Sequence, residues 1–143
     1  MVRSLMLSAL GVALVFAIQA PLQAHTQFKK ALQEEYSFKS VSCYVCHVKG
    51  KDAEGKTLGK EHRNEFGEVL SKLLEGTDVT KKIMDAKEAY KEDHDKEKRD
   101  AVYDAATEEF KKALEKAKPM KSKDGPTWDE LLKGAKLEGL KTE

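Results

Sequence analysis

Cysteine is scarce in this 143-residue chain, which holds two residues of this type, three positions apart. A structural zinc site needs four ligands, and the histidines elsewhere in the chain have no paired spacing to supply the missing ones. The βαβ pattern that usually surrounds a redox Cys-x-x-Cys is missing too, as are strand-like alternation, internal repeats and low-complexity tracts. Neither charge is in excess: 26 Lys+Arg and 25 Asp+Glu give a net charge of +1. The basic residues are too mixed with acidic ones to indicate nucleic-acid binding.

Both cysteines lie in the segment Cys43-Tyr44-Val45-Cys46-His47, which has the C-x-x-C-H pattern of a c-type haem attachment site. In such a site the two thiols add to the haem vinyl groups and leave thioether bonds. The three-residue step places both sulfurs on one side of a helical turn, and the histidine follows where its imidazole can bind the iron. The sequence therefore predicts one covalent haem c, attached through Cys43 and Cys46, with His47 as the proximal axial ligand of the iron.

The N-terminal segment has the pattern of a secretory signal. Arg3 is its only charge, an apolar run extends over residues 5–18, Pro21 ends any helix, and Ala24 is a small residue at the cleavage position. We predict a signal peptide at 1–24, cleaved after Ala24, and an exported, periplasmic domain at 25–143. The run is short for a membrane span, although an uncleaved anchor is the alternative. Export suits the motif, since thiols receive haem outside the cytoplasm and would otherwise pair in an oxidising space.

Helical periodicity dominates the mature chain and predicts an all-α domain of about five helices around one covalently bound haem. Gly76, Pro119 and Gly134 mark helix ends, and Thr127 begins a capping box. The polar segment 48–61 is predicted to be a loop, and the tail after Gly134 is expected to be loose. With 36% charged residues the core is thin, so a porphyrin would add apolar area. The apolar stripes lie at 28–36, 66–74, 79–90, 102–117 and 127–132.

In outline the chain resembles a small bacterial monohaem cytochrome c with a class I-like layout. The resemblance rests on a helix before the motif, the motif near the start of the mature chain, and a helix at the far end. It implies that the first and last helices cross, and that the sixth iron ligand comes from a loop ahead of the last helix. Class II members carry the motif near the C-terminus, which argues against them. Two features depart from class I: the Gly-Pro-x-Leu-like run after His47 is missing, and residues 85–110 form an added acidic helical segment.

The sixth ligand decides whether the iron site is closed or open. Met120 is the first candidate for the distal axial position because it lies in the loop ahead of the last predicted helix, and the alternative is an ordinary exposed methionine. His62 is the runner-up, at the exit of the loop after the motif. The other candidates are Met84, expected in the core, His94, expected in solvent, and His25, at the new N-terminus.

Four aromatic residues are candidate walls of the haem pocket, although aromatic residues at helical spacing more often make helix-to-helix contacts. Charge is uneven along the chain, since residues 85–110 hold ten acidic and five basic residues. Such asymmetry can orient a protein toward a redox partner, and a solvated helix with mixed charges is the simpler interpretation. The four aromatic candidates are Phe38, Phe66, Phe110 and Trp128.

These features predict an exported electron carrier that transfers one electron between redox partner proteins. We expect a monomer that binds no nucleic acid and does not stay in the membrane after cleavage. The alternative is a haem-based sensor or small-ligand-binding module with an open or weak sixth site. An enzyme such as a peroxidase is less favoured, because the sequence shows neither a second haem motif nor a distal acid/base pair.

Overall fold

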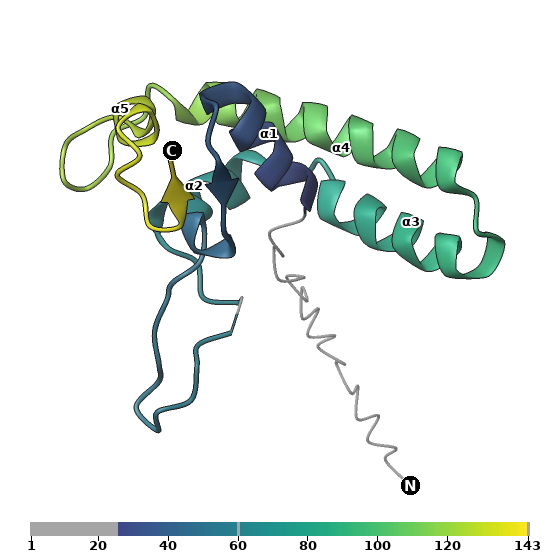
Figure 1. The fold of residues 1–143 in the computed structure, drawn as a ribbon, viewed down its shortest axis with the longest axis horizontal. Coiled ribbons are helices and arrows are strands. Elements are labelled where there is room, and N and C mark those ends of the chain that lie inside the picture. The colour runs from purple at the N-terminus through teal and green to yellow at the C-terminus, as the bar shows by residue number, and fades with distance from the viewer. Residues whose placement is uncertain (1–25, 60, 143) are drawn as a thin grey trace, which may run out of the picture.

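The structure, a computed structural model, describes residues 26–59 and 61–142, so that the predicted signal peptide and His25 lie outside it. Helices dominate the described residues, which confirms the helical fold class (Figure 1). No helix among them has the length and apolar character needed to cross a membrane. The elements in chain order are α1 (Thr26–Tyr36), β1 (Ser40–Val41), the 3₁₀ turn η1 (Cys43–Val45), α2 (Glu65–Leu73), α3 (Val79–Asp93), α4 (Lys96–Ala117), α5 (Trp128–Lys133) and β2 (Leu140–Lys141).

All five predicted helices form, and their ends follow the local signals. Helix α4 stops at Ala117, two residues before Pro119, as proline requires. It begins earlier than its apolar stripe because the Asp95 carboxylate accepts a hydrogen bond from the backbone N–H of Lys98 at 3.0 Å. Helix α5 begins with the predicted capping box, in which Thr127 and Glu130 hydrogen-bond each other's backbone N–H groups.

The helices pack in an order that differs from the layout implied by the resemblance. Helix α1 lies mainly on α4, where the rings of Phe28 and Phe110 stack with centroids 4.3 Å apart. The expected partner, the last helix α5, is six residues long and meets the end of α1 through a hydrogen bond from the Tyr36 hydroxyl to Asp129 at 3.2 Å. Helices α3 and α4 form an antiparallel hairpin that extends away from the other elements (Figure 1).

The prediction of a loose C-terminal tail is wrong. Strand β2 pairs antiparallel with β1, with Val41 opposite Leu140, and the backbone N–H of Ser42 donates to the carbonyl of Gly139 at 2.8 Å. Two-residue strands are too short to show the alternation by which a strand is recognised in a sequence. The tail therefore pairs with the residues that lead into the haem motif.

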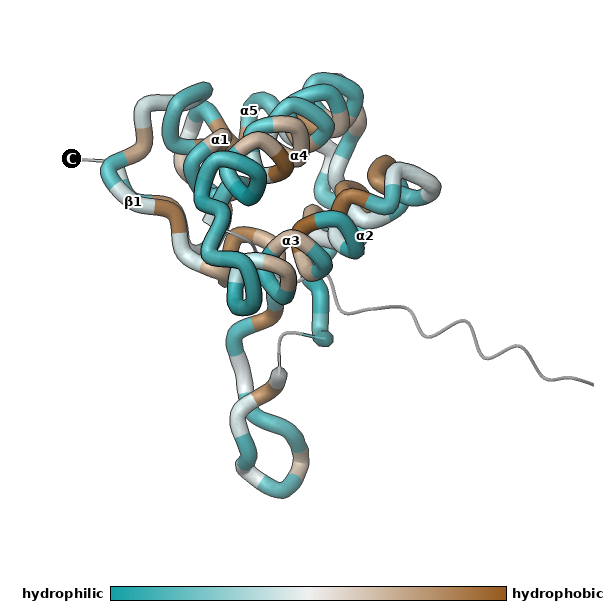
Figure 2. Tube along the Cα trace, turned by 90° about the vertical axis from the view of Figure 1, so that its right-hand side faces the viewer, coloured by the Kyte–Doolittle hydropathy of each residue, from teal (hydrophilic) through white to brown (hydrophobic). Residues whose placement is uncertain are grey.

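The core is built from the apolar faces of the helices, as the hydropathy colouring in Figure 2 shows. The predicted core position of Met84 is wrong, since this side chain is 48% exposed. Its neighbour Ile83 takes the buried position, because one residue along a helix turns the side chain by about 100°. The predicted loop projects from the body as a mainly hydrophilic hairpin, closed by a turn at Asp52–Gly55 (Figure 2).

Candidate functional site

The C-x-x-C-H motif at Cys43–His47 folds as one tight turn, as its spacing predicts. Ser42 caps the turn, since its hydroxyl accepts a hydrogen bond from the backbone N–H of Tyr44 at 3.2 Å. The Cys43 carbonyl accepts from the N–H groups of Cys46 at 3.2 Å and His47 at 3.1 Å. One carbonyl therefore holds the second cysteine and the histidine of the motif over the first cysteine.

The second half of the motif is buried. His47 is 3% exposed and Cys46 8%, whereas Cys43 is half-buried and Tyr44 is exposed. Burial, together with the nearby Cys43, raises the pKa of the Cys46 thiol to about 12. Without haem, Cys46 is therefore a neutral thiol at physiological pH. The motif therefore places one half-buried thiol, one buried thiol and one buried imidazole within a single turn.

Helix α2 and its N-cap residue pack against the backbone of the motif. The sequence did not predict this contact. The side-chain amide of Asn64 donates to the carbonyls of Tyr44 at 3.1 Å and Val45 at 3.0 Å. Its carbonyl oxygen caps α2 by accepting from the N–H of Gly67 at 2.9 Å. A Cβ at Gly67 would lie 2.0 Å from the Cys46 carbonyl oxygen, so the helix needs glycine there. Two sequence features could have indicated the contact: an Asn shortly before the apolar stripe of α2 and a glycine within that stripe.

The runner-up ligand His62 lies close to the motif in the backbone but is exposed. The N–H of Val48 donates to the His62 carbonyl at 2.9 Å, and His47 forms an isolated antiparallel bridge with Arg63. Successive side chains of an extended segment point to opposite faces. Arg63 therefore stands opposite His47, whereas the His62 imidazole lies 3.6 Å from Glu61 in solvent.

The first candidate for the sixth ligand, Met120, lies on the surface directly after α4 and is 41% exposed. Its backbone is well held, because its N–H donates to Ala117 at 2.9 Å and its carbonyl accepts from Trp128 at 3.0 Å. Met84 and His94 lie on the α3–α4 hairpin, and His94 caps α3 with its ring against Tyr90. Of the methionine and histidine side chains in the described part of the chain, His47 is the buried one.

The candidate wall residues are all buried; Phe66, Phe110 and Trp128 make helix-to-helix contacts, whereas Phe38 follows α1 and stacks locally. Phe66 of α2 packs on Trp128 of α5 with centroids 5.1 Å apart, Phe110 stacks on Phe28, and Phe38 stacks on Tyr36. The indole Nε1 of Trp128 is also buried, and residues 26–59 and 61–142 provide no hydrogen-bond partner for it. A buried N–H without an acceptor is rare, because it loses its bond to water.

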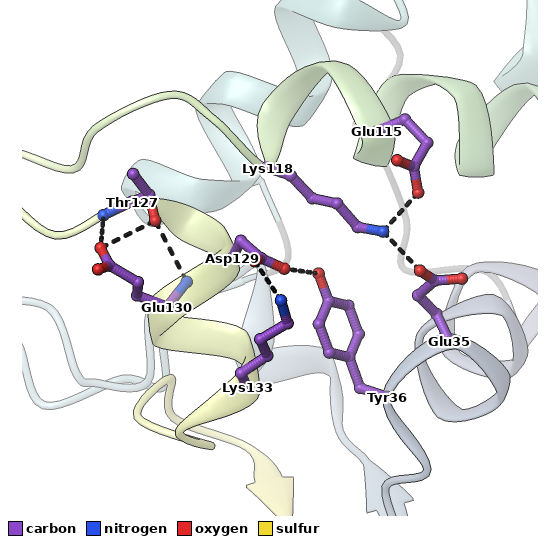
Figure 3. Close-up of polar contacts among 8 residues, drawn as sticks. All are labelled: Glu35, Tyr36, Glu115, Lys118, Thr127, Asp129, Glu130 and Lys133. Carbon is purple, nitrogen blue, oxygen red and sulfur yellow. Dashed lines mark hydrogen bonds and ion pairs between the residues drawn. The ribbon is translucent and has the colours of Figure 1, made fainter.

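A polar network fixes α1, α4 and α5 to one another at one end of the molecule (Figure 3). The Lys118 ammonium binds the carboxylates of Glu35 and Glu115. Tyr36 donates to Asp129, whose other oxygen accepts from Lys133 at 2.6 Å. Burial raises the pKa of the Tyr36 phenol, the Lys118 charge opposes the rise, and the hydrogen bond to Asp129 adds to it.

Within the described ranges, no three His, Cys, Asp or Glu side chains gather as a metal site. A porphyrin brings four nitrogen donors of its own, so a haem iron needs one or two protein ligands rather than such a cluster. Comparison of the chain with protein-family models, with curated proteins and with solved structures found no match.

Proposed function

We propose that this protein is an exported monohaem c-type cytochrome that carries single electrons between redox proteins. The observation that carries the proposal is the Cys43–His47 turn, in which one capped turn presents two cysteines and a buried histidine in the order that haem attachment uses. The haem would supply the redox-active iron.

The residues around the turn fit such a group. Cys43 and Cys46 would form the thioethers, and His47 would bind the iron from the attachment face. The buried indole N–H of Trp128 offers a donor for a haem propionate, which would remove the cost of leaving it unpaired. The packing of α2 on the motif, through Asn64 and Gly67, keeps the turn fixed. A rigid turn keeps reorganisation small when the iron changes charge.

The covalent attachment is tested by the pyridine haemochrome spectrum of protein that has been exported in cells able to mature c-type cytochromes. We expect the absorption of a haem with two thioethers, and haem that stays with the chain in a denaturing gel. The Cys43→Ala variant should show the spectrum of a single thioether, and Cys43→Ala/Cys46→Ala should lose the haem in the gel. A free-haem spectrum from the natural sequence would refute the proposal.

The second candidate function is a haem-based sensor or small-ligand-binding module. It is favoured by one observation: Met120, Met84, His62 and His94 are all exposed, so the buried part of the described chain holds no histidine or methionine besides His47. An open sixth site admits small molecules, whereas a thioether ligand excludes them and raises the reduction potential.

Carbon monoxide binding to the ferrous protein separates the carrier from the sensor. Slow or absent binding at neutral pH, together with loss of the ferric iron–thioether charge-transfer band in Met120→Ala, would identify a carrier closed by Met120. Rapid, tight binding that Met120→Ala leaves unchanged would identify the open site. His62→Ala is the matched control, since it removes the runner-up ligand and leaves Met120 in place.

A further inference from the structure

The α3–α4 hairpin carries a groove along one of its faces. Two hollows of about 640 Å³ and 210 Å³ share Val102 and together follow the hairpin from its base to its tip. Small apolar side chains form the floor between the two helices, and the stacked pair Tyr90 and Arg99 lines the hollow nearer the tip. These floor residues are Ala86, Ala89, Val102, Ala105 and Ala106.

One charge pattern recurs on both helices among the residues that line this groove, beside the further lining charges Asp85, Asp95 and Arg99. On α3 the groove positions are Lys82, Ala86, Ala89 and Asp93, which follow one another at steps of four, three and four residues. On α4 they are Lys98, Val102, Ala105 and Glu109, at the same steps. These steps keep all four residues on one helix face. Each helix therefore presents a lysine, two apolar residues and a carboxylate. Within one chain Lys98 lies 3.6 Å from Asp93, and Glu109 pairs with Lys112 at 2.7 Å, so a dimer would exchange these exposed ion pairs for pairs between copies.

This pattern of charged and apolar residues is self-complementary when two helices lie antiparallel. When two such helices lie antiparallel, the lysine of each meets the carboxylate of the other and the apolar pairs meet in the middle. A twofold axis that crosses the groove perpendicular to both helices places the tip of one hairpin over the base of the other. Each helix then lies antiparallel to the same helix of the partner copy. Lys82 would then face the partner copy's carboxylate at position 93, and Lys98 the one at position 109.

We propose that the α3–α4 hairpin is a self-association surface, on which two copies of the chain form an antiparallel four-helix bundle. This inference stands apart from haem binding and replaces the expectation of a monomer. Antiparallel packing with a self-complementary patch is the usual form of a twofold dimer. The predicted mature chain has equal numbers of basic and acidic residues, so net charge does not oppose association.

The size of the face indicates how strong the dimer is. Helix α3 has 15 residues and is about 22 Å long, and two helices side by side are about 20 Å wide. Such a face covers roughly 450 Å² on each copy, which is below the size of a standard stable interface. We therefore expect a reversible dimer whose population rises with concentration, rather than a permanent one.

The experiment is sedimentation equilibrium on the protein as the cell exports it, from about 1 to 500 μM. The natural protein should pass from monomer to dimer over this range. Ala89→Glu places a charge on the groove floor and should weaken the dimer at least tenfold. Lys91→Glu is the matched control, because nine residues at 100° place it half a turn from Lys82, and its dimer should be unchanged. A natural protein that stays monomeric throughout would overturn the proposal.

A pair of charge variants tests the arrangement itself. Lys82→Glu/Lys98→Glu makes positions 82, 93, 98 and 109 all acidic, and Asp93→Lys/Glu109→Lys makes the same four positions basic. Each variant alone should be monomeric, and an equal mixture should form a heterodimer. Circular dichroism of each variant shows whether the hairpin is folded before mixing. If both are folded and the mixture stays monomeric, the antiparallel pairing is wrong.

Discussion

At the scale of single residues, the site combines groups that differ sharply in exposure. Cys43 is half-buried and lies at the start of the turn, whereas Cys46 and His47 are enclosed by the core. The spacing of the motif predicts this turn, because three residues advance a chain by nearly one helical revolution. The backbone bridge of His47 with Arg63 and the hydrogen bond from the Asn64 N–H to the Cys46 carbonyl join the motif to residues that no local pattern relates to it.

The difference between the two thiols can be measured in haem-free protein. Burial raises the pKa of Cys46 to about 12, so roughly one molecule in 10,000 carries the thiolate there at pH 8. Since the thiolate is the reactive form, we expect iodoacetamide to modify Cys43 much faster than Cys46. Peptide mass spectrometry over time gives both rates.

Unfolding in guanidinium chloride is the control for this reaction, because the two thiols should then react alike. Equal rates in the folded protein would show that Cys46 is accessible.

At the scale of elements, α2 and the motif form one unit. The helical stripe predicted α2, but not that its first turn lies against the Cys46 carbonyl. Asn64 makes the link, since it caps the helix and binds two carbonyls of the motif. A sequence pattern reports which face of a helix is apolar, and it does not report which distant backbone that face meets.

Asn64 variants separate its two tasks. Asn64→Ala removes the cap and both bonds to the motif, and should lower the free energy of unfolding by about 2 kcal/mol. Asn64→Asp keeps an acceptor for the cap but cannot donate to Tyr44 and Val45, so its loss should be of the same order. Urea unfolding measures both values. An Asn64→Asp variant as stable as the natural protein would show that the cap alone matters.

Gly67→Ala tests the close approach of α2 to the motif. The added Cβ would lie 2.0 Å from the Cys46 carbonyl oxygen, so helix or motif must move, at a cost of about 3 kcal/mol or more. Thermal unfolding gives the loss. Gly50→Ala is the control, because its Cβ would meet only the flexible end of Leu58 at 3.3 Å. Similar midpoints for the two variants would contradict the contact.

At the scale of the whole molecule, the helices and their ends follow from the sequence, whereas their arrangement does not. Pro119 and the Thr127 capping box set their boundaries through local chemistry. The pairing of α1 with α4 depends on Phe28 meeting Phe110, a contact between residues 82 positions apart. The network of Figure 3 then connects α1, α4 and α5 through Tyr36 and Lys118.

This network predicts how stability changes with pH. The folded protein holds the Tyr36 proton above pH 10, while the unfolded chain releases it near pH 10, so the unfolded state binds fewer protons there. The free energy of unfolding should therefore fall as pH rises above 10. Urea unfolding at pH 8, 10 and 11 measures the slope, which should be smaller in Tyr36→Phe. Equal slopes in the natural protein and in Tyr36→Phe would contradict the raised pKa of Tyr36.

The pairing of β1 with β2 also determines how late in synthesis the backbone before the motif gains its partners. The backbone before the motif is held by Gly139 and Lys141, about 100 residues further along the chain. At 5–20 residues per second, those partners are synthesised about 5–20 s after Cys43. During this interval the motif lacks its closing strand, so the turn cannot take its final, enclosed form until the C-terminal tail has been synthesised.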